Sequence, residues 1–342
     1  MATRVKIVVL VLMMAVQAVV GSHCAAQTRY GVVFYNVENL FDTYNDISTA
    51  DEDMLPKADR GWSEGRYQHK LQGVAQVIAD LAEQSELPAV VALAEVENRK
   101  VLEDLVAQPQ ISSANYSICH FDSPDERGID VAMLYRADIY FVEGYRAVRA
   151  SVESAPHLLT RDYLLVWGVM GGERMLFCVA HFPSRIGGVK QTEHLRIGCA
   201  AQVREVVDSV VRADPQMRVV VVGDMNDNPR NRSLRRVMGA TRAKGSLRNG
   251  ELYNLTASVS GGSSVYDGRW NRFDNIIVSA NLLGGNTNGL YVVTRSRGKR
   301  MRFVQPLENL LDNKGHPKPT YRGNDYVGGV SDHLPIYMVL ER

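Results

Sequence analysis

The chain has 342 residues, of which 45% are hydrophobic and 23% charged, and its formal net charge is +1. This composition is typical of a globular protein with a substantial core, and the length allows one large domain or two ordinary ones. The near-zero charge excludes nucleic-acid recognition through bulk charge, so any such binding would depend on local basic clusters.

The N-terminus has the pattern of a signal peptide. Arg4 and Lys6 precede an apolar run at residues 7–20, and the small-residue stretch "GSHCAAQ" follows. A basic start, an apolar stretch of this length and small residues before a cut are typical of secretory leaders. We predict that residues 1–26 are removed by cleavage after Ala26, and that the protein is exported to the periplasm or the extracellular space.

A membrane anchor and a lipoprotein are the two membrane-bound alternatives for this segment. The apolar run is too short to span a bilayer comfortably, which disfavours a membrane anchor. A lipoprotein anchored through Cys24 is a further alternative, but His23 directly before it fits that processing poorly. We therefore expect the mature chain, residues 27–342, to have no membrane anchor and to be a monomer.

Strand-like runs recur along the rest of the chain, with few helices between them. Apolar residues at helical spacing predict two helices, at 66–84 and 193–212. Strand-like runs occur at 30–37, 89–96, 130–136, 163–170, 174–182, 218–224, 273–279 and 334–340. The elements do not alternate strictly, which disfavours a purely parallel doubly wound sheet and favours a layered α/β or α+β sandwich forming one domain.

Polar side chains follow or precede many of these strands. In "VVVVGDMNDNP", four valines and Gly223 are followed by Asp224 and, two residues later, Asn226. Each such residue has an ordinary structural reading, because Asp and Asn favour turns and a lone histidine is often packed in a core. Together, residues at the ends of several strands resemble a site at a sheet edge: Asn36, Glu95, Asp130, His181, Asp224, Asn226, Asp274, Asp332 and His333.

These residue types match the needs of phosphodiester hydrolysis. That reaction needs a hard cation held by carboxylate and amide oxygens, a group that activates water, and a proton for the leaving oxygen. Donors for the phosphoryl oxygens complete the requirement. No thiolate cluster, G-x-S-x-G motif or Walker loop indicates another chemistry, and Cys119, Cys178 and Cys199 resemble small core residues.

The order of the motifs resembles the endonuclease/exonuclease/phosphatase superfamily, which has the fold of DNase I. The stretches "YNVENLFD", "ALAEVEN", "RGIDVAMLYR", "VAHFPSRIGG", "VVGDMNDNP", "RFDNIIVS" and "SDHLPIY" follow one another from about residue 30 to the C-terminus. The specific pieces are "GDMN" and "SDHLP". The resemblance implies a four-layered α/β (α+β) sandwich of two packed mixed sheets flanked by helices, and an exported endonuclease-type member.

The resemblance also implies the metal ligands. Glu95 would be the main ligand of Mg²⁺ or Mn²⁺, with Asn36 beside it and Asp332 completing the site. Ca²⁺ is a further candidate. Nucleic acid, either DNA or RNA, would be the substrate.

The resemblance assigns catalytic roles to five further residues. Asp224 would orient or deprotonate the attacking water, and Asn226 would hold a phosphoryl oxygen. His181 and His333 would bracket the phosphate, and Asp274 would orient His333.

Four more positions are expected to support the reaction. Asp130 is the candidate partner of His181, and Arg185 lies four residues after His181, within reach of a phosphate. Arg230 and Arg232 belong to the basic stretch "PRNRSLRR", which directly follows the Asp224 loop and is expected to bind substrate phosphates. Two alternatives stay open: a phosphomonoesterase or phospholipid head-group hydrolase on the same fold, and a non-catalytic binding protein.

Overall fold

The computed structural model describes residues 28–242, 248, 250–283, 289–296 and 299–342. The predicted signal peptide lies outside the described residues. Among the described residues, no helix combines the length and the apolar character needed to cross a bilayer.

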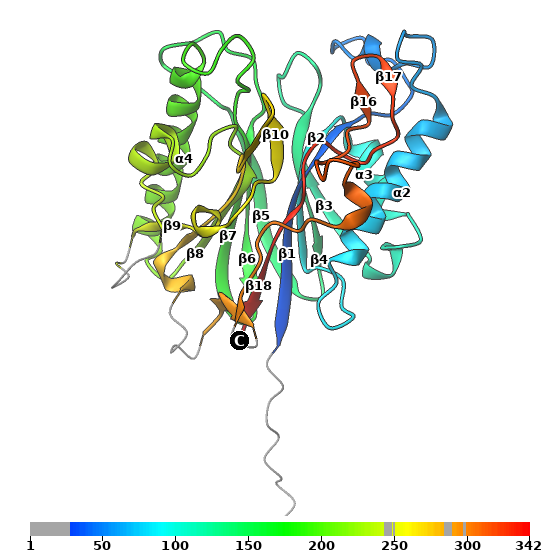
Figure 1. The fold of residues 1–342 in the computed structure, drawn as a ribbon. Helices are drawn as coiled ribbons and strands as arrows, with labels where there is room; N and C mark the ends of the chain where they lie inside the picture. The colour runs from blue at the N-terminus through cyan, green and yellow to red at the C-terminus, as the bar shows by residue number, and fades with distance from the viewer. Residues whose placement is uncertain (1–27, 243–247, 249, 284–288, 297–298) are drawn as a thin grey trace, which may run out of the picture.

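Two six-stranded mixed β-sheets pack face to face (Figure 1). The first sheet has the order β13 (Tyr291–Val292), β18 (Ile336–Glu341), β1 (Arg29–Leu40), β2 (Val90–Val96), β4 (Asp130–Arg136) and β3 (Tyr116–His120). The second has the order β5 (Tyr140–Val148), β6 (Tyr163–Met170), β7 (Glu173–His181), β8 (Arg218–Asp224), β12 (Asp274–Ser279) and β9 (Leu252–Asn254). The β1–β2 and β7–β8 pairs are parallel, and the other pairs in these sheets are antiparallel.

Helices cover the outer faces of both sheets. Figure 1 shows α2 (Glu64–Asp80) and α3 (Arg99–Val106) on the side of the first sheet, and α4 (Glu193–Ala213) on the side of the second. Short helical turns are η1 (Glu52–Met54), η2 (Ser112–Ala114), η3 (Ser233–Val237), η4 (Leu255–Ser258), η5 (Ala280–Leu282) and η6 (Glu308–Leu310). Small two-stranded ribbons are β10 (Ser264–Tyr266) with β11 (Arg269–Asn271), β14 (Arg295–Ser296) with β15 (Lys299–Arg300), and β16 (Tyr321–Arg322) with β17 (Asp325–Tyr326). The predicted fold class, a layered sandwich of two mixed sheets flanked by helices, is confirmed.

Strand β8 shows why an unbroken valine run fits this architecture. Val220 and Val222 face the core between the sheets, whereas Val219 and Val221 face the core beneath α4. Side chains alternate between the two faces of a strand, so a strand covered on both faces needs apolar residues at every position. Because both faces of β8 are packed, the strand is held rigidly, and Asp224 at its end has a fixed position.

The chain ends meet in the first sheet. Strand β1 lies between β2 and β18, and the register places Arg29 opposite Glu341. The guanidinium of Arg29 also donates to the Glu341 carboxylate at 2.7 Å. The first and last strands are therefore neighbours in this sheet.

Candidate active site

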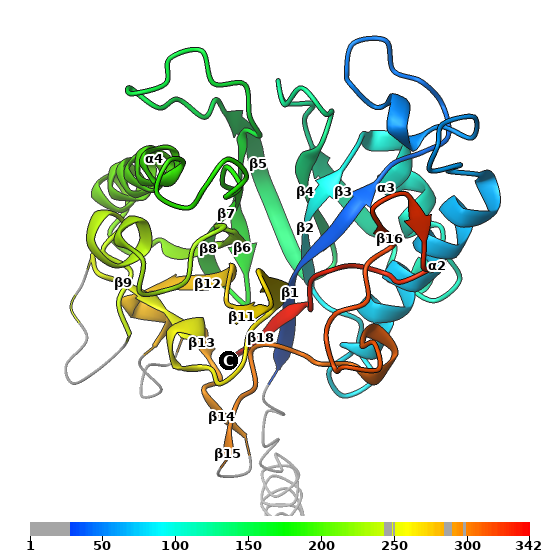
Figure 2. The ribbon, with the colours of Figure 1, turned by 45° about the horizontal axis from the view of Figure 1, so that its top comes forward.

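The predicted site residues of the second sheet are brought together by strand register. His181 ends β7, Asp224 ends β8 and Asp274 begins β12. The parallel register places His181 opposite Asp224, and the antiparallel register places Asp274 opposite Asp224. Figure 2 shows β7, β8 and β12 as neighbours in one sheet, with β1 of the other sheet nearby. Neighbouring strands lie about 5 Å apart, so the register itself assembles this group.

Asn36 joins the two sheets at this edge. Its buried Nδ2 donates to Glu95 Oε1 and to Asp224 Oδ2, at 3.1 Å each. Glu95 has a φ of +64°, and the β2–β4 register shifts between Ala94 and Val96. A bulge with a left-handed residue redirects one side chain of a strand. The bulge thus explains how a residue inside β2 presents its carboxylate to the site.

His181 is held neutral. Burial lowers the pKa of its imidazole well below the usual value, and the nearby guanidinium groups of Arg161 and Arg127 lower it further. Its Nε2 lies 3.6 Å from Asp224 Oδ2 and 3.9 Å from Glu95 Oε1. A neutral imidazole at this position is suited to a single hydrogen bond with a substrate oxygen rather than to ion pairing.

His333 is held protonated. Its Nδ1 lies 2.7 Å from Asp274 Oδ2, and both side chains are buried. Burial opposes the charge, but the carboxylates of Asp274, Asp332 and Asp224 outweigh this effect and raise the pKa of His333 well above its usual value. Asp274 therefore orients the ring as predicted and stabilises an imidazolium whose Nε2 lies 3.8 Å from Asp224 Oδ2.

Asp224 occupies the centre of the group. Its Oδ1 accepts the backbone N–H of Asn226 at 2.8 Å, and Asn226 adopts a left-handed φ of +48°. Burial, together with the Asp274 and Glu95 carboxylates, raises the pKa of Asp224 to about 7 against the favourable charge of His333. A carboxyl group with a pKa near neutrality is suited to accept a proton from water.

The residues present fit a divalent cation. Glu95 offers a carboxylate, a ligand preferred by Mg²⁺, and Asn36 offers Oδ1, which also accepts the backbone N–H of Glu38 at 3.0 Å. The exposed carboxylate of Asp332 lies close enough to His333 to raise its pKa. The pKa of Glu38 is also raised to about 7, mainly by burial and in part by Asp332 and Glu95. Several close carboxylates thus share a site with an excess of negative charge, which a cation would relieve.

Two predicted roles are wrong in this structure. Asp130 pairs with His120 Nε2 at 3.1 Å and accepts the backbone N–H of Ser123 at 2.8 Å, so it does not orient His181. Nδ1 of His181 has no hydrogen-bond partner within the described residues. The reason is that β3, an element without a clear sequence signal, pairs with β4 and places His120 beside Asp130.

Arg185 is committed to the loop after β8 rather than to a substrate phosphate. Its Nε donates to Asn226 O at 2.7 Å, and an Nη donates to Asp227 at 2.9 Å. The guanidinium also lies 4.5 Å from the centre of the Phe273 ring. Through Nε and one Nη, Arg185 thus holds the loop after β8 in place.

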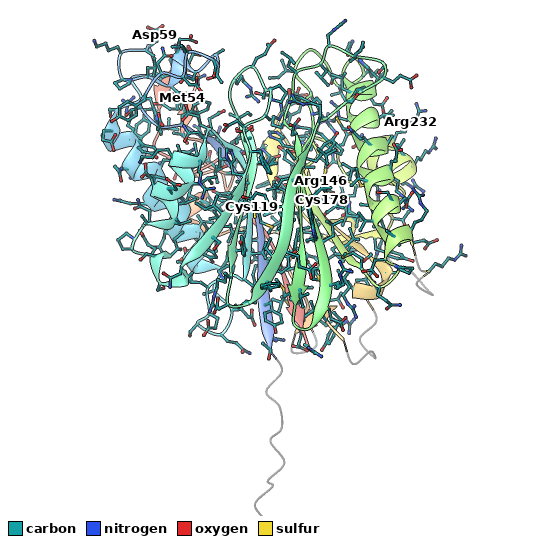
Figure 3. The ribbon with its side chains drawn as sticks, turned by 180° about the vertical axis from the view of Figure 1, so that it is seen from behind. Met54, Asp59, Cys119, Arg146, Cys178 and Arg232 are labelled. Carbon is teal, nitrogen blue, oxygen red and sulfur yellow. The ribbon has the colours of Figure 1, made fainter. Side chains whose placement is uncertain are left out.

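Arg230 and Arg232 are exposed and follow that loop. In Figure 3, Arg232 lies at the outer edge of the half that carries α4. Their binding of substrate phosphates stays a prediction. The buried cysteines Cys119 and Cys178, labelled in the same view, belong to β3 and β7, and Cys199 belongs to α4, each with a free thiol.

Glu38 and Lys70 are site residues that the sequence analysis missed. Glu38 Oε2 accepts the backbone N–H groups of Thr320 at 2.8 Å and Asp332 at 3.0 Å. Lys70, buried in α2, donates to Thr320 Oγ1 at 2.6 Å and to Val330 O at 3.0 Å. These bonds fix both ends of the segment 320–332 next to His333. Lys70 lies four residues before Val74 on the same face of α2, and this spacing is the sequence signal that Lys70 is buried.

Replacing Lys70 with methionine is expected to lower the free energy of unfolding by about 2–3 kcal/mol, because two hydrogen bonds to a charged group are lost. Hydrolytic kcat should fall as well, since segment 320–332 carries Asp332 to the site. Lys100→Met is the matched control: this lysine is 60% exposed and pairs with Asp104 at i,i+4, a contact that contributes about 0.5 kcal/mol or less. Urea unfolding and initial rates measure both effects. Equal losses in the two variants would contradict the assigned role.

The model of the Endonuclease/Exonuclease/phosphatase family matches residues 31–342. A Bacteroides thetaiotaomicron protein of that family has a similar solved structure, with a TM-score of 0.56, 17% identity and coverage of 92% of this chain and 98% of that one. A mannosyl-6-phosphatase from the same organism gives a TM-score of 0.55, 18% identity and coverage of 91% and 99%.

A third similar structure is TDP2 of D. rerio, humanized by 14 mutations, with a TM-score of 0.55, 15% identity and coverage of 91% and 98%. At these identities, the solved structures show a shared fold. The search of curated proteins gave no match.

Proposed function

The chain belongs to the endonuclease/exonuclease/phosphatase family, and from this premise we propose that it is a divalent-metal-dependent phosphodiesterase that cleaves nucleic acid. The observation that carries the proposal is the convergence of Asn36, Glu95, His181, Asp224 and the His333–Asp274 pair at one sheet edge. The fold hosts several substrates, so the phosphoester chemistry rests on the site and the choice of substrate needs its own test.

A cation bound by Glu95 and Asn36, with Asp332 nearby, would supply positive charge to polarise the phosphoryl group. The chain's own residues divide the remaining work. Asp224 accepts a proton from the attacking water. The protonated Nε2 of His333 donates a hydrogen bond to the phosphate and is the source of a proton for the leaving oxygen.

Two more residues hold the phosphoryl oxygens. The Asn226 amide donates one hydrogen to Phe182 O at 3.0 Å, which leaves its second hydrogen for the substrate. Neutral His181, beside Asp224, offers one further hydrogen bond. Because these groups stand on strand ends joined by register, they are positioned before the substrate binds.

Metal removal is expected to abolish activity. With EDTA, nicking of supercoiled plasmid should stop, and added Mg²⁺ or Mn²⁺ should restore it. Glu95→Gln should require at least about tenfold more Mg²⁺ for half-maximal rate, because a charged ligand is lost. Mg²⁺ should also raise the unfolding temperature of the unaltered protein but not of this variant. Undiminished nicking in EDTA would rule out the proposed chemistry.

The nucleic-acid substrate is supported by the exposed Arg230 and Arg232, which follow the catalytic loop. Replacing both with glutamine should weaken plasmid binding and reduce the slope of log affinity against log salt by about 2, because each phosphate contact releases a counterion. Arg146→Gln, on the outer strand β5, serves as a surface-charge control. An unchanged slope would show that this cluster does not contact nucleic acid.

A second candidate is a phosphomonoesterase acting on sugar phosphates. It is favoured by one observation: a mannosyl-6-phosphatase is among the similar structures. The assay panel therefore includes mannose 6-phosphate, RNA, inositol phosphates and sphingomyelin alongside plasmid. Metal-dependent phosphate release from the sugar ester without nicking would select the second candidate.

Export to the periplasm or the extracellular space remains part of the proposal. It is supported by the predicted signal peptide alone. N-terminal sequencing of the protein from its native compartment should begin at Gln27, the residue after the predicted cut.

A further inference from the structure

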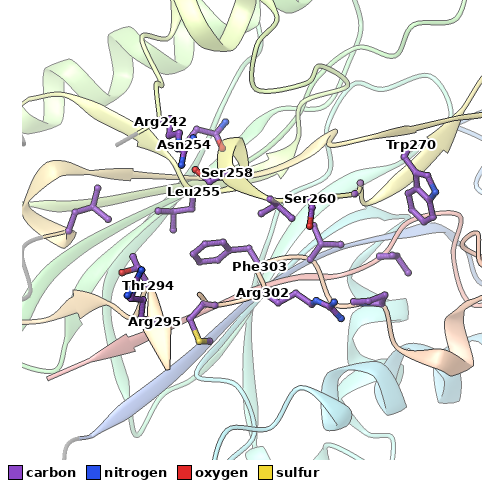
Figure 4. A pocket seen from close by; sticks show the side chains of 18 of the residues that line it. Arg242, Asn254, Leu255, Ser258, Ser260, Trp270, Thr294, Arg295, Arg302 and Phe303 are labelled. Atoms are coloured by element: carbon purple, nitrogen blue, oxygen red, sulfur yellow. The ribbon is translucent and has the colours of Figure 1, made fainter. Parts of the chain in front are cut away.

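A cavity of about 650 Å³ lies outside the catalytic group. It lies between the segments 255–262 and 301–306, and Figure 4 shows it from close by. Cavities of about 300–1,000 Å³ are the size of typical small-molecule sites. Neither the catalytic residues nor the metal ligands line it, so the hydrolytic reaction leaves it without a role.

The walls of this cavity combine an apolar floor with a cationic rim. Phe303, Leu255 and Leu334 line it and are buried. Arg242, Arg295 and Arg302 also line it and are exposed. Among the described lining residues, none is acidic. Three guanidinium groups without a carboxylate among these residues are complementary to an anion, whereas the floor is complementary to hydrocarbon or an aromatic ring.

The cavity shares part of its wall with the catalytic edge. Leu334 follows His333 directly, and its backbone N–H donates to Ser263 O at 2.6 Å. Gly262 lines the cavity beside Ser263. The residues next to the catalytic histidine thus separate the carboxylate-rich catalytic edge from the arginine-lined cavity.

We propose that this cavity is a second ligand site, which binds an organic anion with an anionic group on an apolar body. An arginine of the rim holds the anionic group, and the floor around Phe303 holds the body. A phosphate that carries a planar aromatic ring, as in a nucleotide, and an alkyl phosphate share this chemistry. Their competition with a bound probe distinguishes them. This inference does not depend on which phosphoester the enzyme cleaves.

The test uses 8-anilinonaphthalene-1-sulfonate, an aromatic sulfonate that fluoresces when its ring is buried, added to the purified protein in EDTA. Saturable binding of one molecule per chain is expected. The double variant Arg295→Gln, Arg302→Gln should weaken it by at least about tenfold, because hydrogen bonds to charged groups are lost. Arg230→Gln with Arg232→Gln is the charge-matched control and should leave binding unchanged.

Two further arms test the apolar floor and the anion separately. Ser258→Trp, at an exposed lining position, should block binding by filling the cavity without removing charge. N-phenyl-1-naphthylamine, which lacks the sulfonate, should bind at least about tenfold more weakly. Competition by adenosine 5′-monophosphate would indicate a planar natural ligand, and competition by hexyl phosphate an alkyl one. The rate of hydrolysis of a small phosphate ester should be unchanged in the double variant Arg295→Gln, Arg302→Gln.

Three results would overturn the proposal. The first is fluorescence that rises without saturation. The second is binding that survives both the double arginine change and Ser258→Trp. The third is equally tight binding of the uncharged naphthylamine.

Discussion

Replacing Asp224 with asparagine is expected to lower kcat by about 10³-fold, because the group that accepts the proton from water is lost while its shape is kept. Asp224 is 2% exposed and lies within 4 Å of both histidines of the site. The backbone N–H of Asn226 can still be accepted by the amide oxygen, so the loop after β8 should keep its conformation. The new amide NH₂ would face Nδ2 of Asn36, which donates to Asp224 Oδ2 at 3.1 Å, so the variant also removes this hydrogen bond.

Stability provides the control for this variant. Removal of a buried charge is stabilising, whereas loss of the Asn36 hydrogen bond and of the His333 charge pair is destabilising. The unfolding temperature measured in EDTA should therefore stay within a few degrees of that of the unaltered protein. Asp122→Asn, at a carboxylate that is 85% exposed, should change neither activity nor stability. Residual activity within about tenfold of the unaltered protein would contradict the role of Asp224 as proton acceptor.

Replacing Asp274 with asparagine is expected to lower kcat by about 10²–10⁴-fold, because the amide no longer stabilises the imidazolium of His333 or fixes its tautomer. The chain offers a close control in the second buried histidine–carboxylate pair, His120–Asp130, which has an N–O distance of 3.1 Å. Asp130→Asn breaks the same kind of bond outside the catalytic group.

The two variants should lose similar stability and differ in activity. Urea unfolding should show a comparable cost for both, because each leaves a buried histidine with a weaker partner. Only Asp274→Asn should lose turnover. A matching loss of turnover in Asp130→Asn would restore Asp130 to the catalytic role that its sequence motif suggested.

The sequence predicted the layered fold because buried strands have continuous apolar runs, as in the valines of β8. Polar residues at the ends of these runs identified the edge where Asn36, His181, Asp224 and His333 meet. The helix α3 was missed because its eight residues hold too few turns for a clear period. β5 was missed because it lies at the edge of its sheet and only Tyr140 among its nine residues is buried, so it has no apolar run.

The errors at the site have a common physical origin in long-range partners. Asp130 was assigned to His181 because β3, and with it His120, was not recognised as a neighbouring strand. Arg185 was assigned to phosphate from its position four residues after His181, whereas in the structure it donates to Asp227, 42 positions away. Glu38 contacts Thr320, a separation of 282 positions. No local pattern encodes such a contact.

Because β1 pairs with β18, the last strand of the chain, we expect the catalytic edge to form late in folding. Asn36 O accepts a hydrogen bond from Ser331 Oγ, so residues 295 positions apart must meet before the site exists. Contacts this distant in sequence carry a high entropic cost and slow the folding of a chain. During synthesis, β1, which contains Asn36, can pair with β18 only after the last residues of the chain have been made. Catalytic activity in a refolding experiment should therefore appear with the last kinetic phase, and it reports completion of the whole fold rather than of any one part.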